Sequence, residues 1–160
     1  MRFSALIAAA LALPLALSMA ACSTVREATN FQPPTMQLLS ARVEQQPQQP
    51  QQSGELALVR FEVLAENPNA QPVPMQVVEY SVEAGGTTVF SGTRDAQRTI
   101  PPFGSMRFDL PVGVPVSALG SPLTLRSNVG FRRPGALADT LYNLELIRPA
   151  QPVTGTASVK

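Results

Sequence analysis

The sequence predicts an all-β protein, an antiparallel β-sandwich of about seven short strands like those of immunoglobulin and fibronectin type III domains. Three observations support this prediction. Apolar and polar residues alternate with a period of two in one segment after another, turns rich in Asn, Pro and Gly separate the segments, and no amphipathic helix pattern follows residue 22. Segments spaced in this way favour two packed antiparallel sheets within one domain, residues 35–148.

The first expected strand spans residues 36–43, with Leu39, Ala41 and Val43 on one face. Residues 45–52 consist only of glutamine and proline. A stretch of this composition prefers extended conformations and cannot pack a core. We interpret it as a long loop between the first two strands; the alternative is a docking segment for a proline-reading partner.

The second strand begins at Glu55 and shows the clearest alternation. Its outward residues include Arg60, Glu62 and Glu66, and its expected inward residues are Ala57, Val59, Phe61, Val63 and Ala65. Asn67-Pro68-Asn69 then ends the strand, because Asn67 can close an Asx-turn, Pro68 fixes its own φ, and Asn69 tolerates a left-handed conformation. The motif is therefore expected to fix a corner of the sandwich, or alternatively to form a loop that contacts a partner.

The middle of the chain continues the same pattern. Val78, Tyr80 and Val82 share one face, the Ala-Gly-Gly sequence at 84–86 is a hairpin turn signal, and residues 87–92 are expected to return as a strand. Prolines at 101 and 102 then end the extended segment before them. A long alternation over 106–116 follows, and its prolines lie on the outward side, which indicates an edge strand or a strand bulged near its end.

The last third of the domain is expected to contain one helical turn near 116–122 and two more strands. The first of these strands places Leu123, Leu125, Val129 and Phe131 on its buried face, and the second places Tyr142, Leu144 and Leu146 there. Tyr80 and Tyr142 are both predicted to be core residues with a hydroxyl partner at the rim. Residues 149–160 are expected to form a polar tail.

The N-terminus has the pattern of a bacterial export signal. Arg2 precedes a run of alanine and leucine, and small residues come before Cys22, the sole cysteine. The sequence Met-Ala-Ala-Cys resembles a lipobox, so we expect residues 1–21 to be a lipoprotein signal peptide, Cys22 to be lipidated, and residues 22–34 to contain the tether. The alternative is an ordinary signal peptide with a bystander cysteine. Ser23, in place of aspartate, favours the outer membrane of a Gram-negative envelope, facing the periplasm, by analogy with lipoprotein sorting.

The composition argues against most kinds of chemistry. The chain has no histidine, and its formal charge is +1. No general base that titrates near neutral pH is present, and no basic surface steers toward nucleic acid. We therefore expect no enzyme activity, no catalytic residues, no cofactor, no metal site and no small-molecule substrate.

Two sets of charged residues could form a site instead of a solvated surface. Glu62 and Glu66 could meet Glu79 and Glu83 if their strands pair, giving a Ca²⁺ site or an acid/base pair. The outward parity of all four favours a solvent-exposed face instead. A small basic patch of Arg126, Arg132 and Arg133 is the other set, and three arginines are ordinary on a surface.

The order of these segments resembles the WHy domain of type 2 late embryogenesis abundant proteins. The shared features are a strand, Asn-Pro-Asn, a tyrosine-bearing strand, a Gly-containing hairpin, Ser-Gly, Ile-Pro and a long final alternation, over about residues 34–148. The resemblance implies an immunoglobulin-like sandwich and a non-enzymatic role in tolerance of desiccation. The expected function is a binding or protective lipoprotein of the envelope; the alternative is an assembly subunit of an envelope protein complex.

Overall fold

The computed structural model describes residues 30–44 and 56–158, and these residues form an all-β sandwich as the sequence predicts. The expected signal peptide, Cys22, most of the tether and the Gln/Pro segment lie outside the described residues. The strands are β1 (Thr35–Val43), β2 (Leu56–Glu66), β3 (Val73–Ala84), β4 (Thr87–Ile100), β5 (Ser105–Pro115), β6 (Leu123–Phe131) and β7 (Ala150–Ala157). The helical elements are η1 (Val116–Ala118), which is the expected helical turn, and α2 (Ala136–Asn143).

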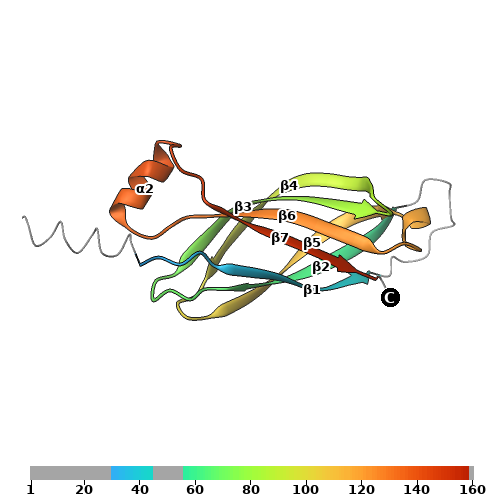
Figure 1. The fold of residues 1–160 in the computed structure, drawn as a ribbon, viewed down its shortest axis with the longest axis horizontal. Helices are drawn as coiled ribbons and strands as arrows, with labels where there is room; N and C mark the ends of the chain where they lie inside the picture. The colour runs from blue at the N-terminus through green and yellow to red at the C-terminus, as the bar shows by residue number, and fades with distance from the viewer. Residues whose placement is uncertain (1–29, 45–55, 159–160) are drawn as a thin grey trace, which may run out of the picture.

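The strands form two antiparallel sheets that pack face to face (Figure 1). One sheet has the order β1-β2-β5 and the other β4-β3-β6-β7. The expected hairpin joins β3 to β4 through Gly85 and Gly86. Their φ values of 56° and 84° are positive, and glycine adopts such values readily because it has no Cβ. β5 lies at a sheet edge, as its outward prolines predict. Pro111 has no backbone N–H, and an edge strand tolerates this loss because only one of its sides is paired.

The core lies between the sheets and is built from the inward positions of the period-two segments. Phe61, Tyr80 and Phe108 are all buried, which confirms the predicted faces of β2, β3 and β5. Burial of apolar side chains from both sheets supplies the main driving force for this fold. Other fully buried side chains are Val59, Val63, Val73, Val82, Ile100, Leu110, Val114, Leu123 and Leu125.

The first strand differs from prediction at Leu39. The register with β2 shifts between Leu38 and Ser40, which marks a β-bulge. A bulge adds one residue to a strand and so reverses the parity of the side chains that follow. Leu38 therefore packs against the core together with Ala41 and Val43, while Leu39 is left exposed.

The fourth strand is longer than predicted and runs from Thr87 to Ile100 instead of ending near residue 92. Its register with β3 is irregular between the partners of Met75 and Val77, and Gln97 there has a φ of 44°. The segment carries charged residues and little apolar alternation, so it has no period-two signal of its own. Pairing with β3 makes it a strand.

The C-terminal part of the prediction is wrong. Residues 150–157 of the expected polar tail are strand β7, which pairs with β6 and buries Val153. The expected strand through Tyr142, Leu144 and Leu146 is instead helix α2 and the turn after it. β7 is an edge strand with a single buried apolar side chain, so the alternation that marks a half-buried strand is too weak to identify it.

Gly155 explains how β7 closes one side of the sandwich against β1. A Cβ placed on Gly155 would lie 2.6 Å from Cδ2 of Leu38. The absence of a side chain therefore allows the β7 backbone to approach Leu38 closely.

Candidate functional site

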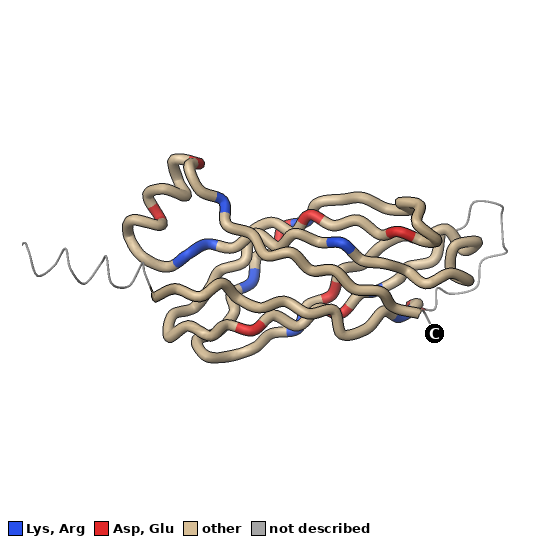
Figure 2. Tube along the Cα trace, in the orientation of Figure 1, with Lys and Arg blue, Asp and Glu red and all other residues tan. Residues whose placement is uncertain are grey.

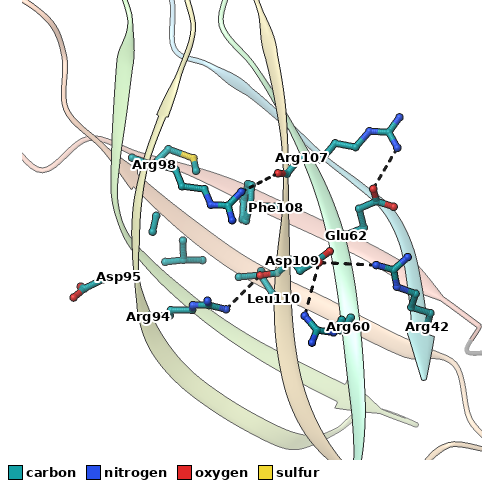
Figure 3. Close-up of a pocket in the computed structure, with 13 residues that line it drawn as sticks. Arg42, Arg60, Glu62, Arg94, Asp95, Arg98, Arg107, Phe108, Asp109 and Leu110 are labelled. Atoms are coloured by element: carbon teal, nitrogen blue, oxygen red, sulfur yellow. Dashed lines mark hydrogen bonds and ion pairs between the residues drawn. The ribbon is translucent and has the colours of Figure 1, made fainter. Parts of the chain in front are cut away.

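The most site-like feature of the described surface is a cavity of about 270 Å³ on the side of the sandwich where β4 faces β5. We call it the arginine groove. Its apolar floor includes Phe108 and Leu110, and its wall is dominated by guanidinium groups. The five arginines that line it are Arg42, Arg60, Arg94, Arg98 and Arg107 (Figure 3).

The arginines on the β1-β2-β5 sheet are partly neutralised by acids. Arg107 lies 3.3 Å from Glu62, and two arginines, Arg42 and Arg60, each lie 3.9 Å from the carboxylate of Asp109 (Figure 3). Arg60 also approaches Glu44 to 2.8 Å. That hydrogen bond and charge raise the pKa of the Arg60 guanidinium, so this group stays charged at every relevant pH.

Arg94 and Arg98 are placed differently. They come from β4 and reach across to the free edge of β5, where they donate to the backbone carbonyls of Asp109 at 3.5 Å and Arg107 at 3.4 Å (Figure 3). Within the described residues neither lies in ion-pair distance of a carboxylate. These two guanidinium groups therefore cover an exposed strand edge and keep N–H donors for a carboxylate or phosphate.

Asn67-Pro68-Asn69 forms a corner, and the predicted Asx-turn is present: Oδ1 of Asn67 accepts from the backbone N–H of Asn69 at 2.9 Å. The Asn67 side chain is 3% exposed and donates to the carbonyls of Gln71 at 2.8 Å and Pro101 at 3.0 Å. Asn69 does not adopt a positive φ; its side chain instead bonds the backbone N–H and C=O of Gln32. The motif thus ties together three separate segments.

The four glutamates weighed as a Ca²⁺ site or an acid/base pair do not meet. Glu62 and Glu66 lie on β2 in one sheet, and Glu79 and Glu83 lie on β3 in the other. Glu83 pairs with Arg126 at 2.9 Å. Convergence on a Ca²⁺ ion or an acid/base pair is therefore wrong, and no metal-holding cluster of His, Cys, Asp or Glu occurs in residues 30–44 and 56–158.

The two tyrosines lie in different environments. Tyr80 is in the core with a hydroxyl partner, as predicted: its hydroxyl donates to the carbonyl of Pro111 at 3.2 Å, and this bond links the two sheets. Burial raises the pKa of the Tyr80 phenol, against a smaller lowering by Arg94. Tyr142 is not in the core: it lies in α2, with the Arg132 guanidinium 5.4 Å above its ring.

The three arginines weighed as a basic patch, Arg126, Arg132 and Arg133, do not form a shared patch. Arg126 pairs with Glu83, Arg132 pairs with Asp139 of α2 at 2.7 Å, and Arg133 covers the ring of Phe31. Figure 2 shows the two signs of charge interspersed over the described chain.

The sequence did not reveal the arginine groove, since its five arginines come from four strands in two sheets. A signal exists in part, because Arg60 and Arg107 occupy outward positions of predicted strands. Arg94 and Arg98 lie between the strands that the sequence predicts.

Comparisons with known proteins agree with the geometry. Residues 62–138 match the family described as late embryogenesis abundant protein. The match includes the Asn67 corner, the hairpin, and the groove arginines of β4 and β5, while Arg42 and Arg60 lie outside it. The match supports the type 2 late embryogenesis abundant family for this domain. This agrees with the resemblance of the sequence to a family linked to water stress.

Solved structures show the same fold at low sequence identity. A solution structure of a late embryogenesis abundant protein is 18% identical with a TM-score of 0.57, and the match covers 92% of this chain and 82% of that one. A solution structure from Arabidopsis thaliana is 12% identical with a TM-score of 0.52, covering 77% and 78%. A Bordetella pertussis crystal structure titled as an ApaA protein is 12% identical with a TM-score of 0.51, covering 81% and 97%. No curated protein matches this chain in sequence.

Proposed function

We propose that this protein is a non-enzymatic lipoprotein of the Gram-negative cell envelope whose late embryogenesis abundant domain binds and protects other envelope components during water stress. The observation that supports the proposal most is that a domain of this family follows a Met-Ala-Ala-Cys sequence at the end of an export signal. No helix among the described residues is long and apolar enough to cross a membrane.

Cys22 is the residue that carries the anchor in this proposal. Each CH₂ of an acyl chain buried in the bilayer contributes about 0.8 kcal/mol, and two or more chains hold a protein stably. With Ser23 after the cysteine, the anchored protein sits in the outer membrane and its sandwich faces the periplasm. In this place the domain contacts envelope components without consuming a substrate.

Replacing Cys22 with serine tests the anchor. We expect labelled palmitate to be incorporated into the wild-type chain and not into Cys22→Ser, and we expect the variant to leave the membrane fraction. Ser23→Asp is the matched control, which keeps the label and moves to the inner membrane. Deletion of the gene should lower survival after drying, and Cys22→Ser should not restore it. An unlabelled wild-type chain refutes the anchor, and unchanged survival of the deletion strain refutes the protective role.

A second candidate function is an assembly subunit of an envelope protein complex. The arginine groove supports it, because Arg94 and Arg98 cover the free edge of β5 with long hydrogen bonds of 3.5 and 3.4 Å. A partner strand with acidic side chains can replace these contacts and add to the sheet edge.

Reversing both charges tests this candidate. We expect chemical crosslinking in intact envelopes to join the wild-type protein to one stoichiometric partner. The double variant Arg94→Glu, Arg98→Glu should lower the affinity at least tenfold, since one charge-assisted hydrogen bond contributes about 1.5 kcal/mol or more. Arg126→Glu, on β6 of the same sheet but outside the groove, is the matched control and should retain the partner. Crosslinking that yields no partner, or one that the double variant retains, contradicts assembly through this edge.

A further inference from the structure

The most exposed large apolar side chains of the described residues are unevenly distributed. Phe103 is 74% exposed, Leu146 67%, Leu144 63% and Leu137 58%, ahead of Leu56 at 53% and Val116 at 42%. Single exposed apolar residues need no explanation, but several at one site indicate an interaction surface.

These four side chains lie at the end of the sandwich where the N-terminal segment joins it. Figure 1 shows α2, the start of β1 and the turn between β4 and β5 at that end, with η1 at the other. Direct contacts agree with the view. The backbone N–H of Phe103 donates to the carbonyl of Asn69 at 3.0 Å, and Asn69 binds Gln32. The ring of Phe31 stacks at 5.9 Å on Phe131, close before α2.

Phe103 is held in an unfavourable state in two respects. Its φ of 47° lies in the left-handed region, where a bulky side chain is rare, and its ring points into solvent. The turn that holds it is fixed by Asn67 and Asn69, so the position is built into the corner. Local strain of this kind persists at sites with a function.

We propose that this end of the sandwich lies on the lipid surface, with Phe103 and the leucines of the α2 segment inserted among the headgroups. The inference rests on the Cys22 anchor proposed above. From Cys22 to Asn30 the chain can span at most about 28 Å. β5 alone is about 36 Å long at the usual rise of a strand. The anchor therefore keeps this end of the sandwich within reach of the membrane, and an upright sandwich holds the η1 end away from it.

The side chains around these residues suit a lipid interface. Residues 131–148 contain three arginines and two acids, so the segment is close to neutral with a slight basic excess. Arg148 is exposed beside Leu146, and Arg133 covers Phe31. The methylene groups of an arginine can lie among apolar groups while its guanidinium contacts lipid phosphates. Apolar side chains of interfacial segments reach about 5–10 Å below the surface.

Single tryptophans test the proposal, because the chain has none of its own. The full acylated protein carrying Phe103→Trp, Leu144→Trp or Val116→Trp is reconstituted into vesicles of phosphatidylethanolamine and phosphatidylglycerol, with or without brominated acyl chains. We expect blue-shifted emission and loss of most fluorescence to bromine for Phe103→Trp and Leu144→Trp. Val116→Trp, at the opposite end, should show neither change.

The outcomes separate this inference from the anchor. If mass spectrometry finds Cys22 unacylated, the anchor proposal fails and this one fails with it. If the acylated protein binds vesicles but the tryptophans at 103 and 144 stay water-exposed, only the membrane-facing end is refuted. Blue-shifted emission that appears without lipid and rises with protein concentration shows that a second copy covers this surface, and also overturns the proposal.

Discussion

Replacing Asn67 with alanine lowers the free energy of unfolding by about 3 kcal/mol, because the change leaves several buried polar groups without partners. Asn67 is 3% exposed, and its side-chain amide donates to the carbonyls of Gln71, Ile100 and Pro101. Its Oδ1 accepts from the backbone N–H and from the side-chain amide of Asn69. Each unsatisfied buried group costs about 1–3 kcal/mol, and neighbouring water recovers part of the loss. Urea unfolding followed by circular dichroism measures the change, in a Cys22→Ser background where no acyl chain is added.

Asn128→Ala is the matched control for this prediction. Asn128 lies on β6, is exposed, and has no side-chain hydrogen bond to another described residue. Its replacement should change the free energy of unfolding by less than about 0.5 kcal/mol. If the two variants lose equal stability, the corner is not held by the Asn67 amide, and the structural interpretation of Asn-Pro-Asn is wrong.

The corner illustrates what the sequence could predict. The strand face before Asn67 is set by period two, and the turn chemistry of Asn and Pro is local, so both follow from neighbouring residues. The partners of the corner are not local. Ile100 and Pro101 are more than thirty residues away, as the separations of 33 and 34 positions show. The sequence therefore predicts that a corner exists but not what holds it.

The errors have the same physical origin. The bulge before Ser40 depends on pairing with β2, and it moves Leu39 to the exposed face. Tyr142, Leu144 and Leu146 alternate like a strand, but Leu137 and Leu141 supply helical spacing as well, and a short window does not separate the two. Arg94 and Arg98 form a groove only because β4 and β5, from different sheets, lie at adjacent edges.

Phe61→Ala is expected to have the largest effect, a loss of about 4 kcal/mol in the free energy of unfolding. Phe61 is fully buried on β2, the central strand of its sheet, where Ala41 of β1 and Leu110 of β5 are its cross-strand neighbours. Removal of the ring loses its transfer free energy and leaves a cavity that two sheets cannot close without breaking their registers. The same urea titration measures it.

Leu56→Ala on the same strand is the control, since Leu56 is 53% exposed and should cost less than about 1 kcal/mol. The difference between the two variants bears directly on the whole fold. The only cysteine is Cys22, so no disulfide within the chain supports the core. Domains of this kind have about 5–15 kcal/mol of stability in total, so losing Phe61 should remove a large share and lower the urea midpoint markedly. Equal, small losses at positions 56 and 61 would mean that period-two burial between the sheets does not hold this protein together.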